Sequence, residues 1–111
     1  TVETSWQVNF TPPLTRQNGE PLLPEEIKWI VCNYRRVGVM AWTWGSNTTQ
    51  EGQTYVDIVD RLLESGDYEI ACQAVDINGL ESLYSVPIIM TIAPPVHFPP
   101  NSPTDVTARD L

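Results

Sequence analysis

The stretch that most constrains the fold runs from Gly66 to Ser85 and opens with strict alternation of side-chain character. Apolar or small residues occupy every second position of its first half: Tyr68, Ile70, Cys72 and Ala74. Glu69 and Gln73 lie at positions between them. Successive side chains of an extended chain point to opposite faces, so this pattern predicts a strand with one buried face.

A turn follows at residues 76–79, whose sequence is Asp-Ile-Asn-Gly. Asn and Gly tolerate the positive φ angles that tight hairpin turns require. Beyond the turn, a second extended run has the apolar residues Tyr84, Val86, Ile88 and Ile92. The two runs predict a β-hairpin. Pro87 has no N–H to donate to a neighbour, so the second strand is expected at the edge of a sheet.

The rest of the sequence favours an all-β fold in one domain. With 111 residues, 41% of them hydrophobic and ten of them proline, the chain can bury a single core. No window keeps a 3.6-residue period for the length of a helix. Val56 to Glu64 comes nearest, but it is short and rich in β-branched residues and is interpreted mostly as strand. No apolar run approaches the roughly 18 residues of a membrane span, so no membrane insertion is expected.

The charge and the absence of reactive motifs exclude several classes of function. Fourteen acidic and six basic residues give a net charge of −8, which disfavours nucleic acid as a partner because phosphate binding needs a basic face. The only histidine, His97, lies in a proline-rich segment, and no motif for nucleophilic catalysis or phosphate binding is present. Residues 76–79 resemble part of a calcium loop, but Glu81 lies too close to be its distal ligand. The sequence predicts no enzyme activity, no metal and no cofactor.

The two cysteines, Cys32 and Cys72, do not have the spacing of metal ligands. Both fall on the predicted inward faces of neighbouring strands. They are interpreted either as a disulfide or as two buried thiols that pack as small hydrophobic residues. The sequence leaves this choice open.

Three segments together resemble a known family. The stretch from Gly66 reads Gly-x-Tyr-x-Ile-x-Cys-x-Ala-Val-Asp-x-x-Gly-x-x-Ser-x-x-Ser, residues 10–22 contain Pro-Pro-Leu-Thr-Arg-Gln-Asn-Gly-Glu-Pro-Leu, and residues 26–34 begin with Glu-Ile. They resemble strands F and G, the end of strand B, and strand C of a fibronectin type III domain of the bacterial or phage kind. The resemblance implies a two-sheet, immunoglobulin-like sandwich without chemistry of its own. It also implies a tyrosine corner at Tyr68, with the hydroxyl bonded to the backbone.

On this resemblance, the strands are assigned in chain order from B to G. The assigned segments are residues 1–10 (B), 26–34 (C), 39–44 (C′), 55–59 (E), the run from Gly66 (F) and the run ending at Ile92 (G), with a polar loop at 45–52.

The chain divides into three parts: residues 1–92 form the sandwich, 93–103 a proline-rich connector and 104–111 a segment that resembles strand A. The last part contains Thr104, Asp105, Val106, Thr107 and Ala108, and with the proline before them they read Pro-Thr-Asp-Val-Thr-Ala, which resembles the Pro-Thr-Asn-Leu-x-Ala that begins strand A in this family. No strand A precedes Trp6, so this segment stands at the wrong end of its sandwich. Two interpretations remain: the segment is donated to the next copy, or it begins the next domain of a tandem array.

The expected function is that of a non-catalytic structural or assembly module at a cell or virion surface. Its expected partners are copies of itself or neighbouring domains of the same protein, joined head to tail by the C-terminal segment. The alternative is a carbohydrate-binding accessory module that binds polysaccharide through an aromatic surface. The aromatic candidates are Trp29, Trp42 and Trp44, which either form that surface or are covered by the core or a neighbour.

Overall fold

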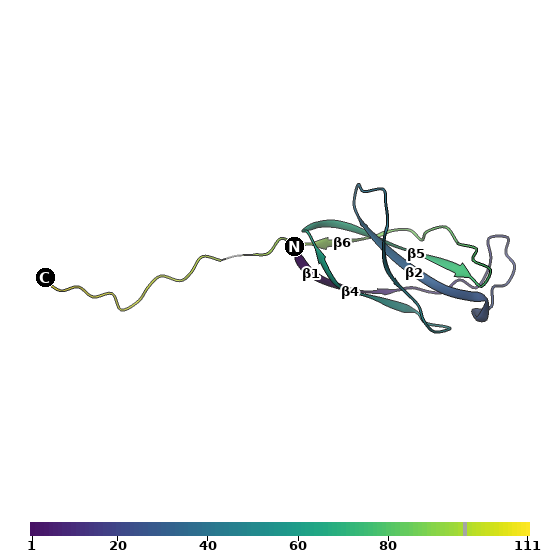
Figure 1. Ribbon diagram of the computed structural model, residues 1–111, viewed down its shortest axis with the longest axis horizontal. Helices are drawn as coiled ribbons and strands as arrows, with labels where there is room; N and C mark the ends of the chain where they lie inside the picture. The colour runs from purple at the N-terminus through teal and green to yellow at the C-terminus, as the bar shows by residue number, and fades with distance from the viewer. Residues whose placement is uncertain (97) are drawn as a thin grey trace.

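The computed structural model describes residues 1–96 and 98–111, and within them the chain forms six strands in two antiparallel sheets (Figure 1). The small sheet pairs β1 with β4, and the large sheet has the order β3-β2-β5-β6. The strand bounds are β1 Val2–Asn9, β2 Ile27–Arg36, β3 Thr43–Asn47, β4 Tyr55–Leu63, β5 Gly66–Asp76 and β6 Ile88–Ile92. A 3-10 turn, η1 (Pro24–Glu26), precedes β2. The predicted all-β, two-sheet fold is confirmed.

The core lies between the two sheets and follows the alternation of the strands. The small sheet contributes Val8, Val56 and Ile58, and the large sheet contributes Ile30, Cys32, Tyr34, Tyr68, Ile70 and Ile92. Trp6 packs against the rings of Tyr34 and Tyr68, with centroids 5.9 Å away in both cases. Cys72 and Ala74, which alternation also placed in the core, are only half-buried. The core is therefore less completely covered beside Cys72 and Ala74.

Tyr68 lies at the start of β5 and is buried, as expected from the sequence. Its hydroxyl donates a hydrogen bond of 2.9 Å to the backbone carbonyl of Glu64, four residues earlier. This contact ties the link between β4 and β5 to the core. A buried hydroxyl that kept no partner would cost about 1 kcal/mol or more.

The predicted strand at residues 39–44 and the predicted loop at 45–52 are each only partly right: residues 39–42 lie outside the strand, and the loop begins at residue 48. The chain turns after Arg36 through Gly38, at φ +92°, and β3 starts only at Thr43. Gly45 lies inside β3, where an added Cβ would come within 2.5 Å of the Cys32 carbonyl oxygen and 2.6 Å of the Ile58 side chain. This glycine allows close packing rather than a loop, and composition alone does not separate these two roles.

Two other strands differ in length from their predictions. β4 continues four residues past the predicted segment 55–59 because Asp60 adopts φ +57° and shifts the register opposite β1. The Asp60 N–H donates to the Ser5 hydroxyl at this bulge. The second strand of the hairpin is shorter than predicted, because β6 begins only after Pro87.

Candidate functional site

The two sides of the sandwich are closed to different degrees. On one side, β3 and β4 touch: the Arg61 guanidinium donates to the Gly45 carbonyl at 3.0 Å, and Ile58 packs against the same glycine. The outer strands on the other side are β1 and β6. In the part of the chain that the structure describes, β1 pairs only with β4 and β6 only with β5. Both therefore leave one edge of backbone N–H and C=O groups without a strand partner. The predicted edge position of the strand after Pro87 is confirmed.

An apolar groove opens on this side, between the end of β1 and the segment that precedes β6. Its volume is about 390 Å³, and it lies near the end of β1 and the second half of β5. Val8 and Phe10 line one wall, Val86 and Ile88 line the other, and Ile30 and Ile70 lie between them. Val86 is 88% exposed, so the wall formed by the segment before β6 is only loosely packed. The same groove borders Ala74 and Cys72, which explains why their side chains are only half-buried.

Two serines hold the segment before β6 against β5 where no regular strand forms. The Ser82 N–H donates to the Ala74 carbonyl and the Ser85 N–H to the Cys72 carbonyl, each at 2.8 Å. In return, the hydroxyls of these serines accept the Ala74 and Cys72 N–H groups at 2.9 Å. Side-chain oxygens thus replace strand carbonyls on one wall of the groove. The Ser-x-x-Ser spacing was visible in the sequence, but this role was not predicted.

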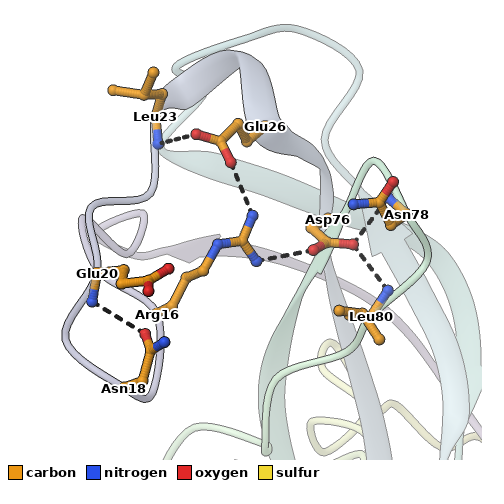
Figure 2. Close-up of polar contacts among 8 residues, drawn as sticks. All are labelled: Arg16, Asn18, Glu20, Leu23, Glu26, Asp76, Asn78 and Leu80. Atoms are coloured by element: carbon orange, nitrogen blue, oxygen red, sulfur yellow. Dashed lines mark hydrogen bonds and ion pairs between the residues drawn. The ribbon is translucent and has the colours of Figure 1, made fainter.

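A charged cluster joins two loops at the end of the sandwich next to the groove (Figure 2). Arg16 donates to Glu26 at 2.8 Å and to the buried carboxylate of Asp76 at 2.9 Å. The other Asp76 oxygen accepts the N–H groups of Asn78 and Leu80. The hydrogen bonds from Arg16 are the main cause that lowers the pKa of both carboxyl groups, and backbone N–H groups add to it.

This cluster was also missed in the sequence, since it joins residues sixty positions apart. The cluster gives residues 76–79, which resemble part of a calcium loop, a different role: both carboxylate oxygens of Asp76 already accept hydrogen bonds from protein groups. Across residues 1–96 and 98–111, no three His, Cys, Asp or Glu side chains gather in a way that could hold a metal ion. Over the same residues, no helix is long and apolar enough to cross a membrane.

The cysteine question that the sequence left open has an answer in the structure. Cys32 on β2 and Cys72 on β5 lie directly opposite each other and form a disulfide, with Cα atoms 4.1 Å apart. The bond links the two central strands of the large sheet, and Cys72 also lines the groove.

The three candidate tryptophans have different neighbours and do not form one platform. Trp29 lies under the Lys28 ammonium, 4.4 Å from the ring centroid, and Trp44 is 56% exposed with the Arg61 guanidinium 5.9 Å away. Trp42 stacks on Tyr84 at 4.7 Å and also lies 4.0 Å from the Arg35 guanidinium. Trp42 is half-buried and already contacts two protein groups.

The strand-like segment at the C-terminus lies away from the groove of its own sandwich. After Ile92 the chain leaves the sandwich and extends away from it (Figure 1). Thr104, Asp105, Val106, Thr107 and Ala108 are all exposed and belong to no strand. Val106 is 82% exposed. His97, interpreted from the sequence as a linker residue, lies outside the described residues.

Comparisons with protein-family models, with curated proteins and with solved structures found no match to this chain. The structure thus establishes an all-β fold of two facing antiparallel sheets. The resemblance to fibronectin type III domains depends on the sequence motifs alone.

Proposed function

We propose that this protein is a non-catalytic assembly module of an extracellular or virion-surface fibre or array. Copies of the chain, or neighbouring domains of the same protein, are joined when the segment Thr104–Ala108 adds as a strand to β1 of the next unit. The observation that carries this proposal is the free edge of β1 beside an open apolar groove. An uncovered strand edge is a template for another chain, and proteins otherwise cover or interrupt such edges.

Three further observations support the proposal. The C-terminal segment is exposed and contains alternating apolar residues at Val106 and Ala108. The proline-rich connector of residues 93–103 spans roughly 30 Å in an extended polyproline conformation, which is enough to reach a neighbour. The disulfide between Cys32 and Cys72 suits an oxidising setting outside the cytosol.

The fold also suits a scaffold better than a sugar-binding surface. A sugar ring stacks on a free aromatic face, but the Trp42 ring is half-buried and already contacts Tyr84 and Arg35. Trp29 and Trp44 each lie near a different cation. Polysaccharide binding is therefore not proposed as a second function.

The test compares the full chain with a chain that ends at Pro95. Both sheets are formed by strands within residues 2–92, so the shorter chain keeps them. We expect the full chain to form larger species as its concentration rises in sedimentation velocity runs, and the shorter chain to remain a monomer. A full-length chain in which residues 104–108 are replaced by Gly and Ser serves as a matched control, and it should also remain a monomer. If the full chain stays a monomer at millimolar concentration, assembly by strand addition is wrong.

A further inference from the structure

We infer that a second copy of this chain occupies the groove between β1 and the segment before β6. Val106 and Ala108 of that copy insert their side chains between the two sheets there. This inference depends on the proposed strand addition and specifies which face of the added strand is buried, where it lies and from which molecule it comes.

Side-chain alternation selects the buried face. In a strand paired with β1, every second residue points toward the space between the sheets, as Val8 does within β1 itself. Val106 and Ala108 share one face of the segment, whereas Asp105 and Thr107 share the other. The added strand can turn either of these two faces toward the space between the sheets. Only the register that turns Val106 and Ala108 inward buries apolar side chains and leaves the Asp105 carboxylate in water. A slip of one residue would place Asp105 in the apolar groove, so this register is strongly selected.

The position of the groove favours a second molecule over the chain's own tail. Ile92 pairs with Gly66, the first residue of β5, whereas the groove borders β5 near Cys72 and Ala74. At about 3.3 Å per strand residue, the tail therefore leaves the sandwich roughly 13 Å beyond the near end of the groove at Ile88 and roughly 26 Å from its far end at Ala74. In Figure 1, the N-terminus lies beside the end of β6, so β1 starts where the tail leaves.

Strand direction leads to the same conclusion. Every strand pairing in the described residues is antiparallel. A strand antiparallel to β1 runs from the groove toward the end where the tail leaves, which is the direction of β6. The chain's own tail would have to reverse, cross the length of the sandwich and reverse again. The tail of a second copy placed end to end enters the groove without any reversal. Such contacts do not close on themselves and generate a filament.

Two matched pairs of full-length variants test this inference by sedimentation equilibrium. On the tail, Val106→Asp places a charge in the groove, whereas Thr107→Asp adds the same charge on the outward face. On the receiving side, Ile88→Asp changes a groove residue, whereas Ile89→Asp changes its neighbour, which does not line the groove. Ile88 and Ile89 are 51% and 55% exposed, so the two changes should affect folding about equally. Thermal unfolding of each variant measures that effect directly.

We expect Val106→Asp and Ile88→Asp to weaken self-association roughly tenfold to a hundredfold, the range for losing one buried aliphatic side chain. Thr107→Asp and Ile89→Asp should change it by less than about threefold. If the full chain associates but both members of each pair weaken it equally, the strand adds elsewhere: the groove assignment is then wrong and the proposed function stands. If the full chain does not associate, the proposed function fails first and this inference fails with it.

A photo-crosslinking amino acid at position 106 identifies the donor molecule. Equal amounts of ¹⁵N-labelled and unlabelled full-length chain are mixed before irradiation, and the crosslinked peptides are analysed by mass spectrometry. We expect crosslinks to Phe10, Val86 or Ile88, about half of them joining a labelled to an unlabelled peptide. Crosslinks to the same residues that always join peptides of one isotope would show that the chain's own tail fills the groove. Crosslinks only outside the groove would also overturn the inference.

Discussion

The two sides of this sandwich exclude water to different degrees. One is the side where β3 meets β4, and the other is the side where β1 faces β6. At β3 and β4, a glycine lets the sheets approach until Ile58 is completely buried, and Arg61 bonds across the gap. At β1 and β6, both strand edges are free and an apolar groove reaches inward to Ile70. The same chain thus closes one side by itself and leaves the other open. The open side is the one to which we propose that another strand adds.

The largest effect is expected on the closed side, from Gly45→Ala. The added Cβ would meet the Cys32 carbonyl oxygen at 2.5 Å, and backbone cannot move aside as a flexible side chain can. Unfolding in urea should show a loss of about 3 kcal/mol. Thr43→Ala, at an exposed position of the same strand, should change stability by less than about 0.5 kcal/mol. Equal losses for the two variants would mean that the close contact at Gly45 does not hold the closed side together.

The next effect concerns the loops that border the open side. Arg16→Ala should lower the melting temperature at pH 7, because it leaves the buried Asp76 carboxylate without its charged partner. Arg16 lowers the pKa of Glu26 and Asp76 below their ordinary values of 4.5 and 3.8. Groups with a lowered pKa stabilise the fold above these values and lose that contribution as the pH falls through the folded-state pKa.

The melting temperatures of wild type and Arg16→Ala should therefore differ most near neutral pH and converge below about pH 4. Differential scanning calorimetry between pH 3 and pH 7 measures this convergence. A difference that stays constant over the whole range would show that Arg16 acts only through packing.

A smaller effect is expected at the wall of the groove. Ser82→Ala removes the hydroxyl that accepts the Ala74 N–H and should cost about 1 kcal/mol in urea unfolding. Ser102→Ala, in the exposed tail, is the matched control and should have no effect. If the two variants unfold alike, the serine hydroxyl does not stabilise the open side, and the segment before β6 is held by its backbone bonds alone.

The smallest effect is expected from salt. Copies that each carry a net charge of −8 repel one another, so screening should strengthen the self-association of the full chain. Raising the ionic strength from 0.01 M to 0.1 M shortens the Debye length from about 30 Å to about 10 Å, and we expect a several-fold gain in association. Association that weakens with salt would indicate contacts between opposite charges instead of an apolar groove.

The sequence by itself determined the features that repeat over a few residues. The alternation around Ile70 predicted β5 and the burial of Tyr68 and Ile70, and Pro87 predicted an edge strand because proline has no N–H to donate. The strand-like pattern around Val106 was also visible. Each of these follows from the two-residue period of an extended chain or from the chemistry of one residue type.

Only the tertiary structure decided the features that depend on distant partners. Gly45 lies in a polar stretch of sequence that is typical of a loop. Its place in β3 depends on how closely the Cys32 carbonyl and the Ile58 side chain approach its backbone. The disulfide depended on a register that sets Cys32 directly opposite Cys72. The groove depends on the order of strands in two sheets, which leaves β1 and β6 as free edges on one side. Local sequence specifies which face of a strand is apolar, but the packing of whole sheets decides which of those faces stay uncovered.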